Sequence, residues 1–171
     1  VVLGLSGGPD SVFLFHLLLK MPNAPRLVAA HVNYGLRGRK SLQDRLFVEK
    51  LCAGRKVPLE ILDLEKTFVQ KKSESGNLEE KCRQIRYLFL EEVRRRHHAK
   101  AILVAHQLND QLETFLLNLT RGSSLKGFRA MRDYDPKRHL LRPLLEISKQ
   151  EILDWLKKHR LSWRIDQSNF S

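Results

Sequence analysis

The chain has 171 residues, of which 42% are hydrophobic and 29% are charged. This length suits one domain with a hydrophobic core, and no stretch approaches the roughly 20 consecutive apolar residues of a membrane span. We therefore expect a soluble, cytoplasmic protein without membrane segments. The 31 lysines and arginines outnumber the 19 acidic residues and give a net charge of +12, which favours a nucleic-acid partner over a merely solvated basic surface.

Short apolar runs alternate with longer segments of helical periodicity, a pattern typical of βαβ units and of an α/β fold with a parallel sheet. In chain order, the expected elements are a strand at 1–5, a helix at 11–20, a strand at 26–33, a helix at 42–56, a strand at 59–64, a helix at 77–98, a strand at 101–105, a helix at 110–119, a strand within 139–145 and a helix at 148–159. Ser148 is the expected N-cap of the last helix. Because crossovers between parallel strands are right-handed, the helices should cover both faces of an open sheet.

Polar segments lie at the ends of three expected strands. They are SGGPDS at 6–11, HVNYGLRG at 31–38 and AHQLND at 105–110. Ligands of open α/β sheets bind beyond the carboxyl ends of the strands. We therefore expect these three segments to meet in one crevice.

The segment SGGPDS has the composition of an anion-binding turn that leads into a helix. It lacks the third glycine of GxGxxG and the Gly-Lys-Ser/Thr of the Walker loop. It offers hydroxyls, backbone N–H groups and one carboxylate, and a carboxylate beside a phosphate implies magnesium between them. The phosphate-binding candidates are Ser6, Gly7, Gly8, Pro9, Asp10 and Ser11. A tight turn with Asp10 as N-cap is the alternative, but the order strand, SGGPDS, helix favours phosphate binding.

Four further charged or polar side chains are candidates for the same ligand. His106 and Asp110 are four residues apart, so they share one helix face and can contact phosphate and magnesium respectively. A capping arrangement is the alternative for this pair. Arg83 and Arg86 are one turn apart and can grip a triphosphate. A solvated basic face is the alternative, and it fits residues 94–98 better.

The end of the second strand is the candidate site for a nucleotide base. If phosphates sat on SGGPDS, the adenine would lie beside this strand, where backbone groups of Ala30 and the side chain of His31 can contact it. The alternative for His31 is a strand-end histidine with a satisfied hydrogen bond. The sequence does not decide between these two interpretations.

SGGPDS resembles the pyrophosphate loop (PP-loop) of the ATP-pyrophosphatase superfamily, whose members adenylate a substrate and release pyrophosphate. Further blocks, in order along nearly the whole chain, are similar to the tRNA(Ile)-lysidine synthetase family. They are AAHVNYGLRG at 29–38, EEKCRQIRY at 79–87, AHQLNDQLET at 105–114, LTRGSSLKGF at 119–128, LRPLL at 141–145 and DQSN at 166–169. The resemblance implies a Rossmann-like fold of the adenine nucleotide alpha hydrolase type.

The resemblance also implies a two-step reaction. ATP adenylates the wobble cytidine of an isoleucine tRNA with loss of pyrophosphate, and free lysine then attacks to form lysidine and expel AMP. The implied cofactors are ATP, bound by residues 6–11 with Ala30 and His31, and magnesium, held by Asp10 and Asp110. The implied catalytic residues are Asp10, His106, Asp110, Arg83 and Arg86.

The resemblance further implies that residues 1–171 are an N-terminal catalytic domain. Val1 already lies in an apolar run, and the family usually continues past the last block into a region that grips tRNA. We therefore expect a fragment whose start lies upstream and whose tRNA-binding region is absent. The sequence leaves open whether the protein forms a homodimer.

The sequence departs from the family pattern at two positions. Tyr34 stands where the family commonly has a second histidine, which weakens any argument that a histidine is essential there. Asn109 stands where the family often has aspartate, so Asp110 is the preferred candidate for the metal ligand.

Three rival functions remain. A tRNA thiolase of the same superfamily usually has paired cysteines, whereas Cys52 and Cys82 are poorly placed for a persulfide or a cluster and are expected to be reduced thiols. A small-molecule synthetase such as NAD synthetase does not explain the charge of +12. A non-catalytic RNA-binding module does not explain acidic residues that would repel RNA.

Overall fold

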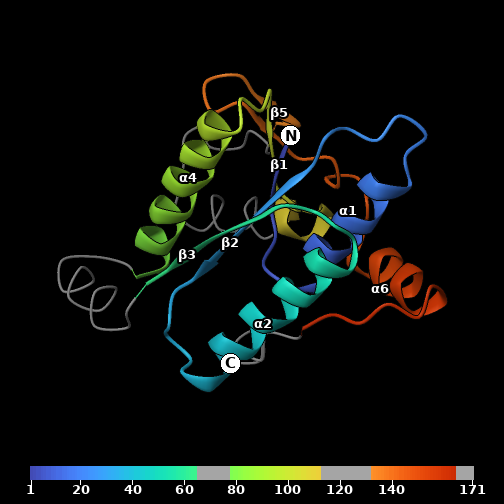
Figure 1. Ribbon diagram of the computed structural model, residues 1–171. Helices are drawn as coiled ribbons and strands as arrows, with labels where there is room; N and C mark the ends of the chain where they lie inside the picture. The colour runs from blue at the N-terminus through green and yellow to red at the C-terminus, as the bar shows by residue number, and fades with distance from the viewer. Residues whose placement is uncertain (65–77, 113–131, 165–171) are drawn as a thin grey trace.

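The computed structural model describes residues 1–64, 78–112 and 132–164. Six strands in these ranges form one sheet in the order β3-β2-β1-β4-β6-β5 (Figure 1). The strands are β1 (Val2–Gly4), β2 (Val28–Asn33), β3 (Leu59–Asp63), β4 (Ile102–Leu103), β5 (Tyr134–Asp135) and β6 (Leu140–Leu141). Neighbouring strands are parallel, except that β5 is antiparallel to β6.

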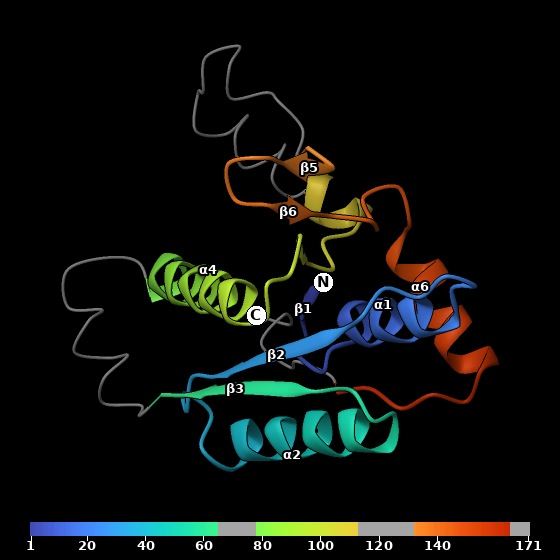
Figure 2. The same cartoon turned by 45° about the horizontal axis from the view of Figure 1, so that its top comes forward.

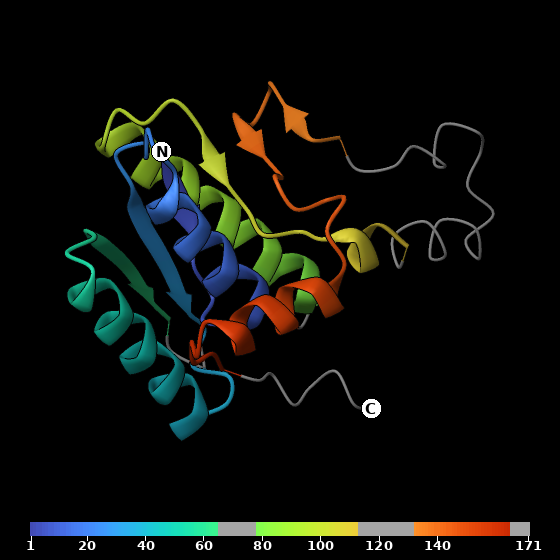
Figure 3. The ribbon, with the colours of Figure 1, turned by 90° about the vertical axis from the view of Figure 1, so that its right-hand side faces the viewer.

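Helices cover both faces of this sheet (Figures 2 and 3). The helices are α1 (Pro9–Lys20), α2 (Arg39–Gly54), α4 (Leu78–Arg96) and α6 (Lys149–Lys158). Successive residues of β1 point to opposite faces: Leu3 packs in a core with α1, α2 and α6, whereas Val2 packs in a second core with α4. No helix in the described ranges is long and apolar enough to cross a membrane.

The centre of the sheet determines where a ligand can bind. Strand β1 pairs with β2 on one side and with β4 on the other, so the chain order reverses between β1 and β4. Open α/β sheets bind ligands at such a switch point, beyond the carboxyl ends of the strands. The segments that follow β1, β2 and β4 therefore border one site, as expected from the sequence.

The structure confirms the α/β fold with helices on both faces and corrects several expected details. The sheet is mixed rather than purely parallel, because the edge strand β5 returns antiparallel to β6. Helix α2 begins at Arg39 instead of residue 42, after Gly38 adopts a φ of 52°, and it ends at Gly54 instead of residue 56, where Lys56 has a φ of 54°. The helix expected at 110–119 begins at residue 108, and its part beyond 112 lies outside the described residues.

The start of α6 follows its sequence signal closely. The Ser148 Oγ accepts a hydrogen bond from the Glu151 N–H at 3.3 Å, and the Glu151 Oε2 accepts one from the Ser148 N–H at 2.8 Å. This reciprocal capping box satisfies N–H groups that the first helical turn leaves without partners. The N-cap expected at Ser148 is confirmed.

Candidate active site

The loop between β1 and α1 is held by its own hydroxyl groups. The Ser11 Oγ donates to the Gly8 carbonyl at 3.0 Å and accepts from the Gly7 N–H at 3.2 Å. Since a serine has one hydroxyl proton, the 3.0 Å contact between the two Oγ atoms must be donated by Ser6. The Gly8 N–H in turn donates to the Ser6 Oγ at 3.3 Å. These four donors are therefore engaged within the loop, and a phosphate oxygen would have to replace one of these acceptors to bind them.

Gly7 is required by its conformation and by its surroundings. Its φ of 91° is one that other residues rarely adopt. A Cβ at this position would also lie 3.3 Å from the Val48 Cγ2 and 3.4 Å from the Phe47 Cδ1. The positive φ, together with these close side-chain contacts, therefore favours glycine at residue 7.

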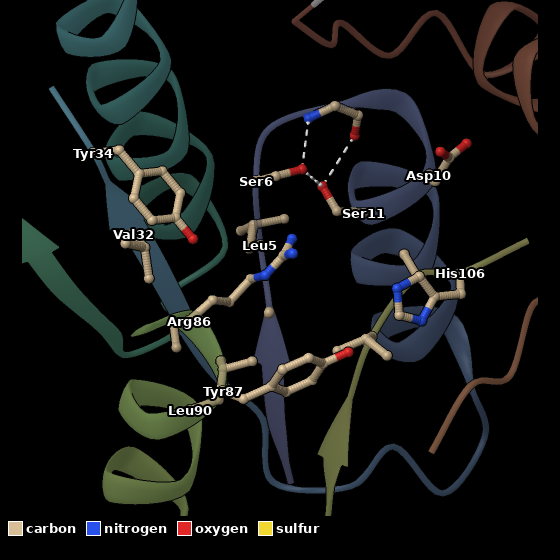
Figure 4. Close-up of a pocket in the computed structure, with 15 residues that line it drawn as sticks. Leu5, Ser6, Asp10, Ser11, Val32, Tyr34, Arg86, Tyr87, Leu90 and His106 are labelled. Carbon is tan, nitrogen blue, oxygen red and sulfur yellow. Dashed lines mark hydrogen bonds between the residues drawn. The ribbon is translucent and has the colours of Figure 1, made fainter. Parts of the chain in front are cut away.

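Asp10 lies in the first turn of α1 and lines a cavity beside the loop (Figure 4). We call this the loop cavity; its wall includes Ser6, Asp10, Tyr34, Arg86, Tyr87 and His106. The Asp10 Oδ1 is buried and has no hydrogen-bond partner among the described residues. Burial and, secondarily, the charge of Asp110 raise the pKa of Asp10 to about 6, and Lys149 partly opposes this shift. An unpartnered carboxylate oxygen near a second carboxylate fits a cation.

Asp110 interacts electrostatically with Asp10 and also makes a hydrogen bond at the start of its own helix. Its Oδ2 accepts a hydrogen bond from the Gln107 N–H at 2.9 Å, which caps the helix that begins at residue 108. The capping alternative for Asp110 is therefore present in the structure, together with a charge that reaches Asp10. The described residues hold no cluster of three or more His, Cys, Asp or Glu side chains that could bind a metal. Magnesium suits such a pair, because it commonly takes one or two carboxylates and completes its shell with phosphate and water.

His106 follows β4 and lines the loop cavity on the same side as Asp10, across from Tyr34 (Figure 4). Its Nδ1 accepts a hydrogen bond from the Arg142 Nε at 3.3 Å, so the ring proton is on Nε2. Burial, followed by the charges of Arg142, Arg86 and Arg83, lowers the pKa of His106 to about 4. The imidazole is therefore neutral near pH 7 and can donate from Nε2.

Arg142 is a site residue that the sequence reasoning missed. It lies beyond β6 in the apolar run LRPLL, is 8% exposed, and also donates from Nη1 to the Arg132 carbonyl at 2.7 Å. These contacts fix the guanidinium against His106. In the sequence, the one sign of a role for Arg142 was its charge within an otherwise apolar run. That His106 is its partner becomes clear only because β6 lies beside β4.

The end of β2 contributes to two adjoining cavities. Ala30 and Tyr34 line the loop cavity, while His31 lines a neighbouring one. The His31 Nδ1 donates to the Leu5 carbonyl at 2.8 Å, and the ring is 4% exposed. This geometry matches the alternative of a satisfied strand-end histidine, and contact with adenine stays a prediction for Ala30 and His31.

Tyr34 has a role that the family pattern did not indicate. Its hydroxyl donates to the Cys82 carbonyl at 2.9 Å and ties the end of β2 to α4. Burial raises the pKa of Tyr34 to about 12, so this phenol stays protonated at neutral pH.

The structure separates the two arginines expected to grip a triphosphate. Arg86 lines the loop cavity and points into it beside Tyr87 (Figure 4). Arg83 instead lines a neighbouring groove that shares Tyr87 with the loop cavity. Both charges are close enough to lower the pKa of His106, and their part in binding phosphate stays a prediction.

Comparison with known proteins identifies the family of this fold and site. A family model for the PP-loop domain matches residues 1–171. The chain belongs to the PP-loop domain family. It is 38% identical to the tRNA(Ile)-lysidine synthase of Clostridioides difficile (strain 630) and 36% identical to that of Geobacillus kaustophilus (strain HTA426), in each case over 99% of this chain and 37% of the relative. The resemblance seen in the sequence motifs is confirmed.

Two solved structures share the architecture of this PP-loop domain. The U34-tRNA thiolase NcsA from Methanococcus maripaludis, with its 4Fe-4S cluster, matches with a TM-score of 0.80 at 21% identity, over 99% of this chain and 60% of that one. An NH3-dependent NAD synthetase from Campylobacter jejuni matches with a TM-score of 0.59 at 20% identity, over 99% and 65% of the two chains. At these identities the likeness concerns the fold alone.

Proposed function

We propose that this PP-loop domain is the ATP-binding catalytic part of a cytoplasmic tRNA(Ile)-lysidine synthetase. The observation that carries the proposal is the similarity to tRNA(Ile)-lysidine synthases along 99% of the chain. The chain spans 37% of the length of these relatives. We therefore assign the activity to a larger protein, in which other regions help to grip the tRNA.

The proposed reaction has two steps. The carbonyl oxygen of the wobble cytidine attacks the α-phosphorus of ATP, and pyrophosphate leaves. The amine of free lysine then attacks the activated ring carbon, the bond from that carbon to the AMP oxygen breaks, and the amine loses its proton. The lysine amine is itself the nucleophile, so no protein nucleophile is required.

The residues around the loop cavity match the charge that develops in the first step. The leaving pyrophosphate gains negative charge, which the Ser6 and Ser11 hydroxyls, the loop N–H groups and the Arg86 guanidinium can stabilise. The neutral His106 can donate from Nε2 without carrying a charge.

Asp10 and Asp110 are the residues that would hold magnesium. The buried Oδ1 of Asp10 has no hydrogen-bond partner among the described residues, and burial, followed by the charge of Asp110, raises the pKa of Asp10 to about 6. Both observations favour a bound cation. Bound magnesium would supply positive charge that stabilises the leaving pyrophosphate.

The thiolase alternative is weakened by the chain's two cysteines. Cys52 is 1% exposed in the core beside α1, and burial raises its thiol pKa to about 12. Cys82 lies on α4, packed on the other face of the sheet, and burial also raises its pKa. High pKa values disfavour the reactive thiolates that sulfur transfer needs.

Labelled lysine tests the proposed reaction. The complete protein, given ATP, magnesium and a tRNA with a cytidine wobble base, should transfer labelled lysine into the tRNA. A Cys52→Ala, Cys82→Ser variant should retain this transfer, and alanine avoids burying a hydroxyl at residue 52. Sulfur in the tRNA instead of lysine, or loss of transfer in a demonstrably folded double variant, would overturn the proposal.

A further inference from the structure

Tyr87 is surrounded by positive charge. The guanidinium carbons of Arg83, Arg86 and Arg138 lie 5.8, 5.9 and 5.5 Å from the centre of its ring. In the part of the chain that the structure describes, none of these three arginines forms an ion pair with a carboxylate. Three like charges around one ring repel each other, so an anion bound between them would be favoured.

The same tyrosine stands between the loop cavity and a groove along α4. This groove, which we call the Tyr87 groove, runs between α4 and the turn that joins β5 to β6, two elements that face each other in Figure 2. Its cationic lining residues are Arg83, Arg95, Lys137 and Arg138, and its acidic ones are Glu80 and Glu91. Glu91 is already bonded to Arg94 and Arg95 at 2.7 and 2.8 Å. Within the described ranges, Glu80 contacts only the Gln84 Nε2, at 3.5 Å. Among the described residues, the cations Arg83, Lys137 and Arg138 therefore face one unpaired carboxylate, and positive charge is in excess.

We propose that the Tyr87 groove binds a single-stranded segment of the RNA substrate and leads its reactive base into the loop cavity. This inference rests on the proposed function, because it takes RNA as the substrate. The phosphates lie against Arg83, Lys137 and Arg138, and a base stacks on Tyr87. Proteins bind single strands by this combination of a basic groove and an aromatic platform. Because Tyr87 lines both spaces, the nucleotide next to the stacked base reaches the loop cavity.

A second basic surface lies at the amino ends of the strands and serves as a control for the Tyr87 groove. It is lined by Arg26, Arg96, His97, His98 and Lys100, without an aromatic side chain other than histidine. Arg96 and His97 are already paired with Glu60, at 2.8 and 2.7 Å. This surface has part of its charge compensated and no tyrosine on which a base can stack, and it does not adjoin the loop cavity.

Charge reversal in the complete protein tests the Tyr87 groove. The probe is a fluorescent single-stranded RNA, and its affinity is measured by anisotropy over a range of salt concentrations. Arg138→Glu should weaken binding about tenfold at low salt. It should also reduce the steepness with which the logarithm of the binding constant falls with the logarithm of the salt concentration by about 0.7, because one phosphate is no longer neutralised. Arg26→Glu makes the same charge change at the other basic surface and should leave both quantities unchanged.

Substitution of Tyr87 separates stacking from charge. Tyr87→Ala should weaken binding by about 5- to 100-fold, whereas Tyr87→Phe keeps the aromatic face and should bind like the unmodified protein. A thermal shift induced by ATP and magnesium checks that each variant retains the loop cavity. Equal effects of Arg138→Glu and Arg26→Glu, or a Tyr87→Phe variant as weak as Tyr87→Ala, would overturn the inference.

The outcomes also distinguish this inference from the proposed function. If the unmodified protein binds no RNA and transfers no lysine, the proposed function fails and the groove inference fails with it. If the unmodified protein transfers lysine to tRNA but the Arg138 and Tyr87 variants bind RNA normally, only the groove inference is wrong.

Discussion

Folding disfavours the negative charge of Asp10. Its Oδ1 is buried without a partner, and burial, more than the charge of Asp110, raises its pKa from 3.8 to about 6. Because the folded pKa exceeds the unfolded value, the protonated form is favoured by folding. The stability that this group contributes is complete below pH 3.8 and is lost as the pH rises through about 6. The proposed metal-binding role and the stability of the fold therefore oppose each other at this residue.

Asp10→Asn should separate these two effects. Near neutral pH, the substitution should raise the free energy of unfolding by about 1 kcal/mol, a value discounted because the side chain is partly exposed. Near pH 4 the gain should be much smaller. Pyrophosphate release should fall at least about 100-fold because the proposed metal ligand is lost. Thermal denaturation at both pH values and a pyrophosphate assay check this. Asp133→Asn, at an exposed carboxylate, is the control; a wild-type level of release in Asp10→Asn would exclude the metal role.

Individual site residues were predictable where their chemistry is local. Ser6 and Ser11 follow from one short segment, because their hydroxyl groups bond within the loop. Asp10 belongs to the same segment. Arg142 was not predictable, since its contact with His106 joins residues 36 positions apart and depends on β4 lying beside β6. The sequence could not decide the orientation of His31 either, because its partner is the Leu5 carbonyl, directly after the neighbouring strand β1.

At the scale of elements, the segment after α6 fastens the loop to α2. The Arg164 N–H donates to the Gly7 carbonyl at 2.8 Å, and its Nε donates to the Asp44 Oδ1 at 2.7 Å. Asp44 is 9% exposed and also accepts from the Arg37 Nη2 at 2.8 Å. A terminal segment, the loop and α2 are therefore joined around one buried carboxylate.

Arg164→Ala should loosen this junction. The backbone bond to Gly7 survives, but Asp44 loses one of its two arginine partners, so the free energy of unfolding should fall by about 1–3 kcal/mol. The KM for ATP should rise severalfold, because the loop is less well positioned. Thermal denaturation and ATP titration of the complete protein measure both effects. Lys158→Ala, at an exposed position on α6, should change neither; an unaltered KM in Arg164→Ala would show that the junction does not position the loop.

Elements were predictable in proportion to their length and to their terminal signals. Helix α6 has a capping box in its own sequence, and the structure confirms its N-cap at Ser148. Strand β5 has two residues and packs antiparallel at the edge, so it is too short to produce a periodic pattern. Pro9 belongs to the expected loop segment, yet α1 begins at this residue, because proline is well suited to the first turn of a helix.

At the scale of the whole molecule, the net charge of +12 is not evenly available to a partner. The basic cluster at 94–98 is largely neutralised within the fold: Glu91 pairs with Arg94 and Arg95, while Glu60 and Glu92 pair with Arg96. This agrees with the interpretation of that cluster as a solvated face. The composition predicted an excess of positive charge, but only the structure distinguishes paired from unpaired cations.

Salt dependence should reveal which cations hold the RNA. Affinity for tRNA should fall with salt, with a log–log slope of about −0.7 for each phosphate neutralised on single strands and about −0.9 on duplex. Arg96→Gln should leave that slope unchanged, because its guanidinium is paired at 2.8 and 2.6 Å with Glu60 and Glu92, and its loss should cost less than about 1 kcal/mol of stability. Titrations of the complete protein at several salt concentrations measure the slope. A slope near zero for the unmodified protein would exclude binding driven by charge. A less steep slope for Arg96→Gln than for the unmodified protein would mean that RNA displaces the ion pairs within the 94–98 cluster.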